Sequence, residues 1–363
     1  NKVKNNSFPG EVAFKLYDTY GFPIDLTQDY LKKKNIKVDV ESFNDKMEEQ
    51  KQRARKNWKG TGDILENKIW FEVTEKLKST EFLGYEKSVA ESVIISIVSN
   101  NQKVEKLNNG EEGIIILNQT PFYGESGGQV GDKGLLKNQN FEFIVNNTTK
   151  ILENYFLHWG KVTKGECCNK DLIQASINKP RRDLIKSNHS STHLLHSSLR
   201  EILGNHVAQK GSLVNEEKLR FDFSHNEPIK NESILKIENL VNEQIKKDNK
   251  IKIKILDQKK AIDDGALALF GEKYGDEVRV VSMGENNNLI FSKELCGGTH
   301  VSRTSEIIKF KIISETSIAS GIRRIEAISN ITVDQYINKQ EELSSKNEKN
   351  NIEEIKIYKD KIE

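Results

Sequence analysis

The chain has 363 residues, of which 36% are hydrophobic and 30% charged, and its formal net charge is +2. This length predicts two or three domains, and the near balance of 56 basic and 54 acidic residues excludes nucleic-acid binding driven by overall positive charge. The sequence contains no apolar run of membrane-spanning length, no secretory leader and only three cysteines, so we expect a soluble, cytoplasmic protein without a disulfide framework.

Residues 1–62 carry the pattern of a small helical unit. In SFPGEVAFKLYDTYGF a proline stands at the first turn, and Val12, Leu16 and Tyr20 recur at helical spacing. Two further helical runs follow, one from about residue 25 and one in ESFNDKMEEQKQRARKNWK, before a Gly-Thr-Gly break at Gly60. We therefore predict three helices in this segment.

Residues 63–165 change to a β pattern. Short apolar runs, SVIISIV, GIIILNQ, FEFIV and YFLHWGKV, are separated by asparagine and glycine turns, which predicts a small barrel or curled sheet. The same segment contains TPFYGESGGQVGD, which lacks the Gly-Lys-Ser/Thr ending of a phosphate loop. Glycines between β-runs usually form turns, so we interpret this motif as structural, with a wall of the substrate cleft as the alternative.

Residues 166–330 predict an α+β domain. PRRDLIKSNHSSTHLLHSSLREILGNH indicates a long helix that ends near Gly204, and strands and shorter helices alternate after it. One helical arc supplies the expected buried stripe, formed by Leu184, Leu195, Leu199 and Ile202. Residues 331–363 predict a charged helix, with the start of a coiled coil as one interpretation. The fold class is therefore α+β: a helical unit, a β-barrel-like domain, an α+β domain with a metal site, and a charged helix.

Two pairs of residues in the α+β domain have metal-ligand chemistry. His189 and His193 are four apart on the predicted helix, so both imidazoles lie on one face. Cys296 and His300 bracket two glycines in ELCGGTHV, where a tight turn lets thiolate and imidazole converge. Each pair alone is more simply explained by packing, but together they favour a metal site, and three nitrogens with one sulfur favour zinc.

The chemistry of such a zinc ion stays open at this point. Four protein ligands close a tetrahedral site, whereas a hydrolytic zinc normally keeps a position open for water. One ligand is then loose, or the site expands to five ligands, or the ion only orients a substrate whose own hydroxyl activates the water. The sequence does not identify the catalytic base.

Several motifs occur in an order that resembles a known family. SNHSSTHLLHSSLREILGNHVAQKGSLV, LRFDFSH, ALFGEKYGDEVRV, ELCGGTHV and GIRRIEA resemble the editing domain of alanyl-tRNA synthetases. FKLYDTYGFPIDLT is similar to the end of that family's tRNA-recognition region, and FYGESGGQVGD to its intervening β-barrel. The ATP-binding motifs of a class II core are not recognisable. We therefore expect the chain to be an internal piece, with ATP-dependent alanine attachment belonging to residues before Asn1.

The resemblance implies an activity, a cofactor and a partner. The activity is hydrolysis of tRNA(Ala) that wrongly carries serine or glycine, because a pocket shaped for alanine excludes neither amino acid strongly. The cofactor is one Zn²⁺, and ATP serves only the core that lies outside this chain. The partner is the acceptor end of mischarged tRNA(Ala), and oligomerisation through a C-terminal region beyond this chain is compatible with the pattern. The implied zinc ligands are His189, His193, Cys296 and His300.

The resemblance also points to three residues of the substrate pocket. Thr192 and Gln209 can hydrogen-bond a seryl hydroxyl, and Arg323 can meet the acceptor-end phosphates or terminal adenosine. The simpler alternatives are a threonine bonded to its own helix, a solvated amide and a surface charge. A second basic cluster with the same two interpretations is formed by Arg181, Arg182 and Lys186.

Two other functions remain open on the sequence alone. A free-standing hydrolase that edits in trans would share the chemistry but would not need the helical unit at residues 1–62. A non-catalytic RNA-binding module with a structural zinc would share the ligands but not the hydrolysis.

Overall fold

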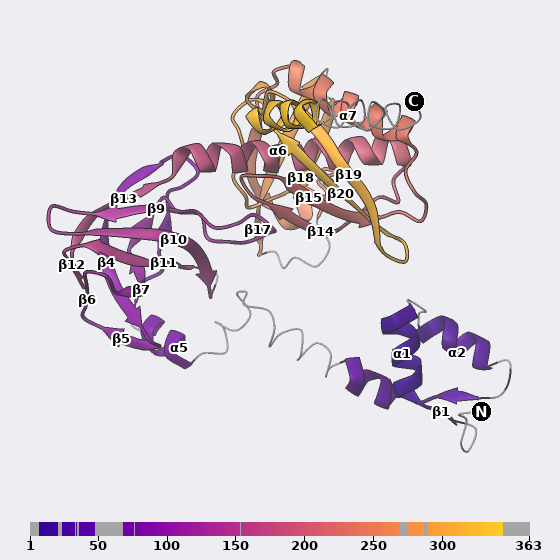
Figure 1. Cartoon of the computed structure of the whole chain (residues 1–363), viewed down its shortest axis with the longest axis horizontal. Coiled ribbons are helices and arrows are strands. Elements are labelled where there is room, and N and C mark those ends of the chain that lie inside the picture. Colours follow the sequence, from indigo (N-terminus) through magenta and orange to yellow (C-terminus); the bar gives the residue numbers. More distant parts are fainter. Residues whose placement is uncertain are drawn as a thin grey trace, which may run out of the picture. The chain divides into compact units, whose positions relative to one another are not determined.

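The chain divides into two compact units, Asn1–Leu77 and Lys78–Glu363 (Figure 1). The computed structural model describes residues 7–20, 24–32, 34, 36–47, 68–75, 77–152, 154–268, 275–286 and 289–343. In the described part, none of the helices has the length and apolar character that crossing a membrane requires.

The first unit is mainly helical, as predicted. Its elements are β1 (Ser7–Phe8), α1 (Gly10–Tyr20), α2 (Ile24–Lys32), β2 (Lys37–Val38), a helical segment at residues 40–47, and α5 (Lys68–Thr74). The two short strands pair in parallel. Ala13, Leu31 and Phe43 are buried. Of the predicted third helix, residues 41–47 are helical and the remainder lies outside the described residues.

A closed β-barrel opens the second unit, which confirms the β pattern. Its six strands are β4 (Val89–Ser99), β7 (Glu112–Leu117), β9 (Gly134–Lys137), β10 (Glu142–Ile151), β11 (Tyr155–Lys164) and β13 (Leu172–Ile177). They follow the order β13-β9-β10-β11-β7-β4, and pairing of β13 with β4 closes the ring. β4 alternates exposed and buried positions because one face of a barrel strand points inward.

Short strands complete the barrel. β5 (Gln102–Val104) extends the sheet beside β4, β12 (Glu166–Cys168) pairs with β6 (Lys106–Asn108), and β3 (Glu81–Phe82) pairs in parallel with β8 (Gln119–Thr120). The interior is apolar and includes Ile94, Leu117 and Phe143.

The long helix α6 (Lys179–Leu203) follows the barrel directly. The Asn178 side chain caps its first turn by accepting a hydrogen bond from the Arg181 amide, and Gly204, with a φ of 114°, ends it. The predicted end near Gly204 is confirmed. α6 packs with α7 (Asn231–Lys246) against a four-stranded antiparallel sheet, which runs in the order β14 (Gln209–Val214), β15 (Leu219–Ser224), β20 (Ile322–Ser329) and β19 (Phe310–Ala319).

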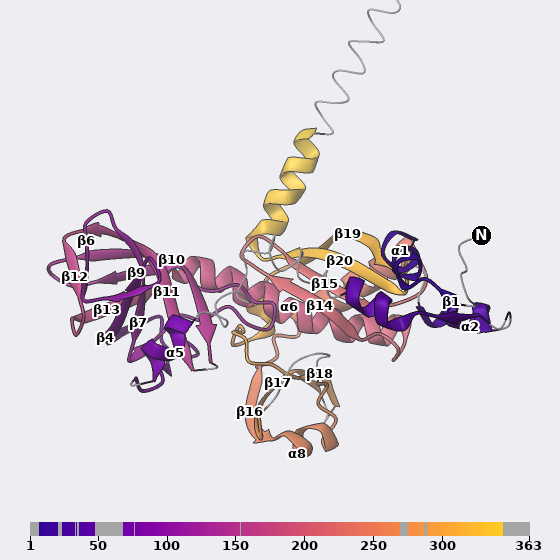
Figure 2. The ribbon, with the colours of Figure 1, turned by 90° about the horizontal axis from the view of Figure 1, so that it is seen from below.

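A second, three-stranded sheet lies within the same unit (Figure 2). It is formed by β16 (Lys252–Asp257), β17 (Glu277–Asn286) and β18 (Leu289–Leu295), with α8 (Gln258–Asp263) packed on it. The short helix η1 (Thr304–Ile307) precedes β19, and residues 331–343 form a final helix. The predicted continuation of that helix lies outside the described residues.

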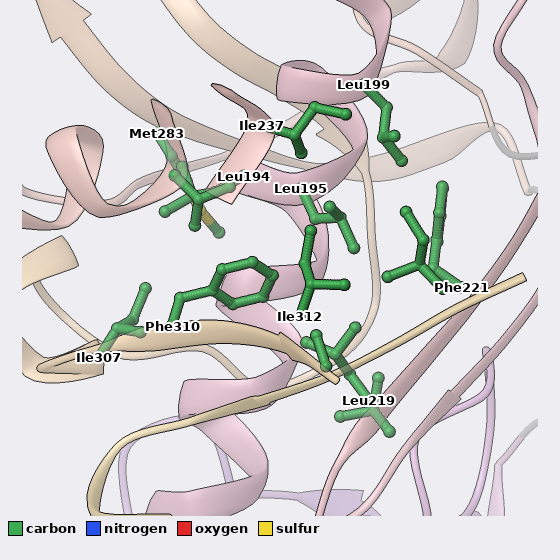
Figure 3. Packing of buried hydrophobic residues seen from close by; sticks show 14 of the residues in the cluster. Leu194, Leu195, Leu199, Leu219, Phe221, Ile237, Met283, Ile307, Phe310 and Ile312 are labelled. Carbon is green, nitrogen blue, oxygen red and sulfur yellow. The ribbon is translucent and has the colours of Figure 1, made fainter. Parts of the chain in front are cut away.

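The predicted buried stripe of α6 is correct only in part. Leu195 and Leu199 are fully buried, but Leu184 is only half-buried and Ile202 is exposed. Figure 3 shows Leu194, Leu195 and Leu199 meeting side chains of the sheet and of the segment before β19. The middle of α6 is covered on several sides, so its buried surface is wider than one apolar arc and includes polar residues.

Candidate metal centre

Four buried side chains from two segments meet at one point. α6 supplies His189 and His193 from its covered middle, and the turn after β18 supplies Cys296 and His300. One nitrogen or sulfur donor atom from each lies within 4.8 Å of the other three, and this group could hold a metal ion. The two pairs that the spacing singled out are therefore brought together.

Distances within the cluster are short. The Cys296 Sγ lies 3.4 Å from His189 Nε2 and 3.3 Å from His300 Nε2. The ring centroids of His189 and His300 are 4.4 Å apart, and those of His193 and His300 are 4.8 Å apart. Three imidazoles and a thiol thus surround a common point rather than stacking in a row.

The turn that carries Cys296 requires glycine at position 298. A Cβ atom on Gly298 would lie 2.1 Å from His189 Cε1, a separation that no side chain permits. The Arg279 guanidinium donates to the carbonyls of Cys296 and Gly298 at 2.8 and 2.9 Å. Tyr85, from the segment before the barrel, donates its hydroxyl to the Gly297 carbonyl at 2.7 Å. The turn is therefore held from two sides.

Each imidazole of the cluster has an oxygen beside its Nδ1 atom. His189 Nδ1 lies 2.8 Å from Gln129 Oε1, and His300 Nδ1 lies 3.2 Å from the Ser190 hydroxyl. His193 Nδ1 lies 3.1 Å from the Glu294 carboxylate, which also contacts His196 Nδ1 at 2.9 Å. An acceptor at Nδ1 favours the tautomer whose Nε2 lone pair is free to bind a metal, and the Gln129 amide oxygen is such an acceptor for His189.

Burial controls the charge of these groups. It lowers the pKa of His189 and of His300 well below the usual histidine value, and neighbouring positive groups lower both further. Burial also lowers the pKa of His193. Burial acts to raise the pKa of Glu294, but the adjoining His193 and His196 bring it below its usual value. The imidazoles are therefore neutral at pH 7, which is the form that binds metals, and Glu294 is an ionised acceptor.

Two family matches cover most of this architecture. Residues 1–181 match the family described as tRNA synthetases class II (A), and residues 278–326 match the threonyl and alanyl tRNA synthetase second additional domain. The chain belongs to the alanyl and threonyl tRNA synthetase family. The second match contains Cys296 and His300, whereas His189 and His193 lie between the two matches.

The glycine motif TPFYGESGGQVGD, for which the sequence favoured a structural turn, contacts the cluster of His189, His193, Cys296 and His300. Gln129 is fully buried, and its Oε1 atom accepts from the Thr299 amide at 2.9 Å as well as facing His189. The motif also adds to the edge of β14, because the Val214 amide donates to the Gly128 carbonyl at 2.7 Å. The alternative, that this motif forms a wall of the substrate cleft, stays a prediction. A glutamine directly after two glycines was the available signal.

The structure places the three predicted pocket residues differently from one another. Thr192 is buried next to His193, and its hydroxyl donates to the Asn188 carbonyl at 2.9 Å. Gln209 begins β14 and lies opposite Phe223 of β15, which in turn lies opposite Arg323 of β20. Arg323 forms an ion pair with Glu315. Within the described residues, no hydrogen bond or ion pair joins Gln209 or Arg323 to the four cluster residues.

The basic cluster at the start of α6 has mostly structural partners. Arg181 donates to Glu216 at 2.7 Å and to the Gly131 carbonyl at 2.8 Å. Arg182 is 2% exposed and pairs with both oxygens of the equally buried Asp132. It also donates to two carbonyls, those of Gly84 and Pro121. All of these contacts of the Arg182 guanidinium therefore join α6 to the barrel domain.

Proposed function

We propose that the cluster holds one zinc ion and that the chain hydrolyses the ester of tRNA(Ala) wrongly charged with serine or glycine. The observation that carries the proposal is the convergence of three neutral imidazoles and a thiol within 4.8 Å, in a chain of this synthetase family. A site that removes amino acids is needed where a synthetic pocket cannot exclude a competitor by size.

The donor set supports zinc over the hard divalent cations. Magnesium and calcium prefer oxygen ligands, whereas zinc accepts nitrogen and thiolate together. In a tetrahedral zinc site a sulfur and a nitrogen ligand are about 3.5 Å apart, from usual bond lengths of about 2.3 and 2.0 Å. The Cys296 to His189 and Cys296 to His300 separations of 3.4 and 3.3 Å fit that spacing.

The residues of the chain prepare the site for an ester. When bound, the ion supplies a Lewis acid that polarises a carbonyl and orients the substrate. The Gln129 amide oxygen adjoins His189 Nδ1, and the Ser190 hydroxyl and the Glu294 carboxylate lie beside the Nδ1 atoms of His300 and His193, so polar groups surround all three imidazoles. Burial of the cluster limits bulk water and strengthens each electrostatic contact.

We propose that Thr192 recognises the side chain of the seryl group. Its hydroxyl hydrogen is already used by the Asn188 carbonyl, so its oxygen offers only lone pairs. A seryl hydroxyl can donate to that oxygen, whereas alanine has nothing to donate. Gln209 and Arg323 remain proposed contacts of the amino acid and of the RNA end. Glycine is included as a competitor that is smaller than alanine.

The test is deacylation of seryl-tRNA(Ala) by the full chain. We expect Cys296→Ala to lose bound zinc and to reduce deacylation by on the order of a hundredfold or more, because one of four ligands is removed. The matched control is Cys168→Ala, a half-buried cysteine on β12 outside the cluster. Deacylation that survives in a folded, zinc-free protein would exclude the metal-dependent mechanism. A zinc-bound wild-type chain that binds tRNA without hydrolysing it would instead indicate a structural zinc.

A second substrate separates the possible sources of the attacking water. Seryl-tRNA ending in a deoxyadenosine lacks the free ribose hydroxyl beside the ester. If that hydroxyl activates the water, deacylation of this substrate falls sharply while zinc content is unchanged. Equal rates would assign activation to the metal site instead.

A further inference from the structure

A cleft with a volume of about 430 Å³ lies beside the cluster turn and takes no part in the proposed chemistry. Its walls come from the segment before the barrel, the first turns of α6 and residues 301–308. Two of its lining residues adjoin the turn directly, since Tyr85 donates to the Gly297 carbonyl and Val301 follows His300. The volume falls within the usual range for small-molecule sites.

Four basic side chains line this cleft, and two are already neutralised. Arg182 is paired with Asp132, and Lys179 lies 2.6 Å from Asp183. For Lys87 and Lys186, no carboxylate among the described residues lies within ion-pair distance.

The acidic side chains of the cleft leave Lys186 available. Glu306 accepts from the backbone amides of Ser302 and Arg303, and Glu86 is the remaining acid on the rim. Burial, and then the nearby Arg182, lower the pKa of Lys186, and Asp183 and Glu306 offset this effect only in part. An anionic group entering the cleft would relieve that repulsion.

The cleft also holds an isoleucine in a strained conformation. Ile308 has φ and ψ of 68° and −66°, and the Lys309 amide donates to the Ile307 carbonyl at 2.8 Å, which makes Ile308 the centre of a tight γ-turn. Left-handed backbone is strongly disfavoured for a β-branched residue. The Ile308 side chain is nevertheless 53% exposed and lines the cleft.

Asn330 holds this turn in place. Its backbone amide donates to the carbonyls of Ile307 and Lys309 at 3.1 and 3.0 Å, and its side-chain amide donates to the Glu306 carbonyl at 3.1 Å. Strained residues that are fixed in this way concentrate at functional sites. Burial in the core does not account for this strain, because the Ile308 side chain faces the cleft with Ile177 and Val301.

We propose that this cleft binds one nucleotide of single-stranded RNA, with the base against Ile308 and Tyr85 and the phosphate at Lys186. This inference rests on the proposed function, since the nucleotide that carries the ester must lie at the cluster and a neighbouring unpaired nucleotide must lie close by. The Tyr85 ring is suited to the base, because it is 43% exposed and Arg279 already covers one side at 4.3 Å.

The test measures binding of an uncharged RNA hairpin with an unpaired 3′ CCA end by fluorescence anisotropy, using the full chain. We expect Lys186→Met to weaken binding about five- to tenfold and to reduce the salt dependence by about 0.7 of a log unit per log unit of salt, as for one lost phosphate contact on a single strand. Lys186→Arg should bind like the wild type. Lys254→Met, an exposed lysine of β16, is the matched control.

Ile308→Gly separates binding from folding. Glycine suits the left-handed turn, so we expect this variant to keep or raise the melting temperature while binding the CCA hairpin about fivefold more weakly. A hairpin without the unpaired nucleotides should not distinguish this variant from the wild type. A role in folding alone predicts the opposite, a lower melting temperature with unchanged binding.

The outcomes distinguish this inference from the proposed function. Wild-type affinity in both Lys186→Met and Ile308→Gly, or failure of the wild type to bind the hairpin, would each overturn the cleft assignment. Seryl-tRNA deacylation with an unchanged KM in both variants would overturn it while the proposed function stands. RNA binding that depends on Lys186 and Ile308, in a chain that hydrolyses no ester, would support the cleft assignment and contradict the proposed hydrolase activity.

Discussion

Buried histidines occur in both the barrel and the α6 region, and their surroundings differ in one decisive respect. In the barrel, His158 Nδ1 lies 2.9 Å from the Ile115 carbonyl and its Nε2 lies 2.8 Å from the Thr120 hydroxyl, so the protein uses both nitrogens. In the cluster, protein oxygens adjoin only the Nδ1 atoms of His189 and His300, and their Nε2 atoms face the Cys296 sulfur. Both ring nitrogens of the barrel histidine thus have oxygen partners, whereas the Nε2 atoms of two cluster histidines converge on one thiol, in an arrangement that could hold a metal ion.

The largest predicted effect tests the barrel side of this comparison. Burial lowers the pKa of His158 to about 4, against an unfolded value of 6.5. The neutral form is favoured in the folded state, so its stabilisation is complete above pH 6.5 and is lost as the pH falls toward 4. The shift corresponds to about 3 kcal/mol of the free energy of unfolding.

The measurement is denaturant unfolding of the wild type and of His158→Gln between pH 7 and pH 4. The cluster histidines contribute equally to both proteins, so the difference between the two isolates His158. We expect the wild type to lose its advantage over this range. A difference that does not change with pH would show that the barrel histidine is not held neutral by the fold.

An intermediate effect is expected at the carboxylate behind the cluster. Glu294→Gln removes the charge that faces His193 and His196 while keeping the size of the side chain. Partners of metal ligands typically change metal affinity by about 10- to 100-fold, so we expect zinc affinity, measured by competition with a chelator, to fall within that range. Glu315→Gln, which alters a buried carboxylate paired with Arg323, is the control and should leave zinc affinity unchanged.

The smallest effect concerns the amino acid rather than the metal. Thr192→Val keeps the shape of the side chain but removes the oxygen that we propose accepts the seryl hydroxyl. A lost neutral hydrogen bond of about 1 kcal/mol predicts about a fivefold fall in kcat/KM for seryl-tRNA(Ala), with little change for glycyl-tRNA(Ala). Equal losses for both substrates would assign Thr192 to helix stability instead.

The sequence predicted the parts of this molecule that depend on local pattern. Short apolar runs separated by asparagine and glycine turns predicted the barrel, and helical spacing placed His189 and His193 on one face of α6. Cys296 and His300 were recognisable because the two glycines between them allow a tight turn. These signals lie within a few residues of each other, where periodicity and turn chemistry act directly.

The partners of the ligands could not be predicted in this way. Gln129 reaches His189 from 60 residues earlier in the chain, and Glu294 reaches His196 from 98 residues later. Gln129 follows two glycines, but neither that pattern nor the sequence around Glu294 identifies the histidine that each side chain contacts. The stripe on α6 was partly wrong for the same reason, because the covering elements, rather than the helix itself, decide that Ile202 is exposed.

The buried ion pair of Arg182 and Asp132 restricts where the chain can be divided into pieces that fold separately. Asp132 belongs to the barrel and Arg182 to the second turn of α6, and both are almost completely enclosed. Dividing the chain between Ile177 and Lys179 would leave a guanidinium on one piece and a carboxylate on the other, and an unpaired buried charge costs about 3–5 kcal/mol. The barrel and the α6 domain are therefore expected to be more stable together than as separate pieces.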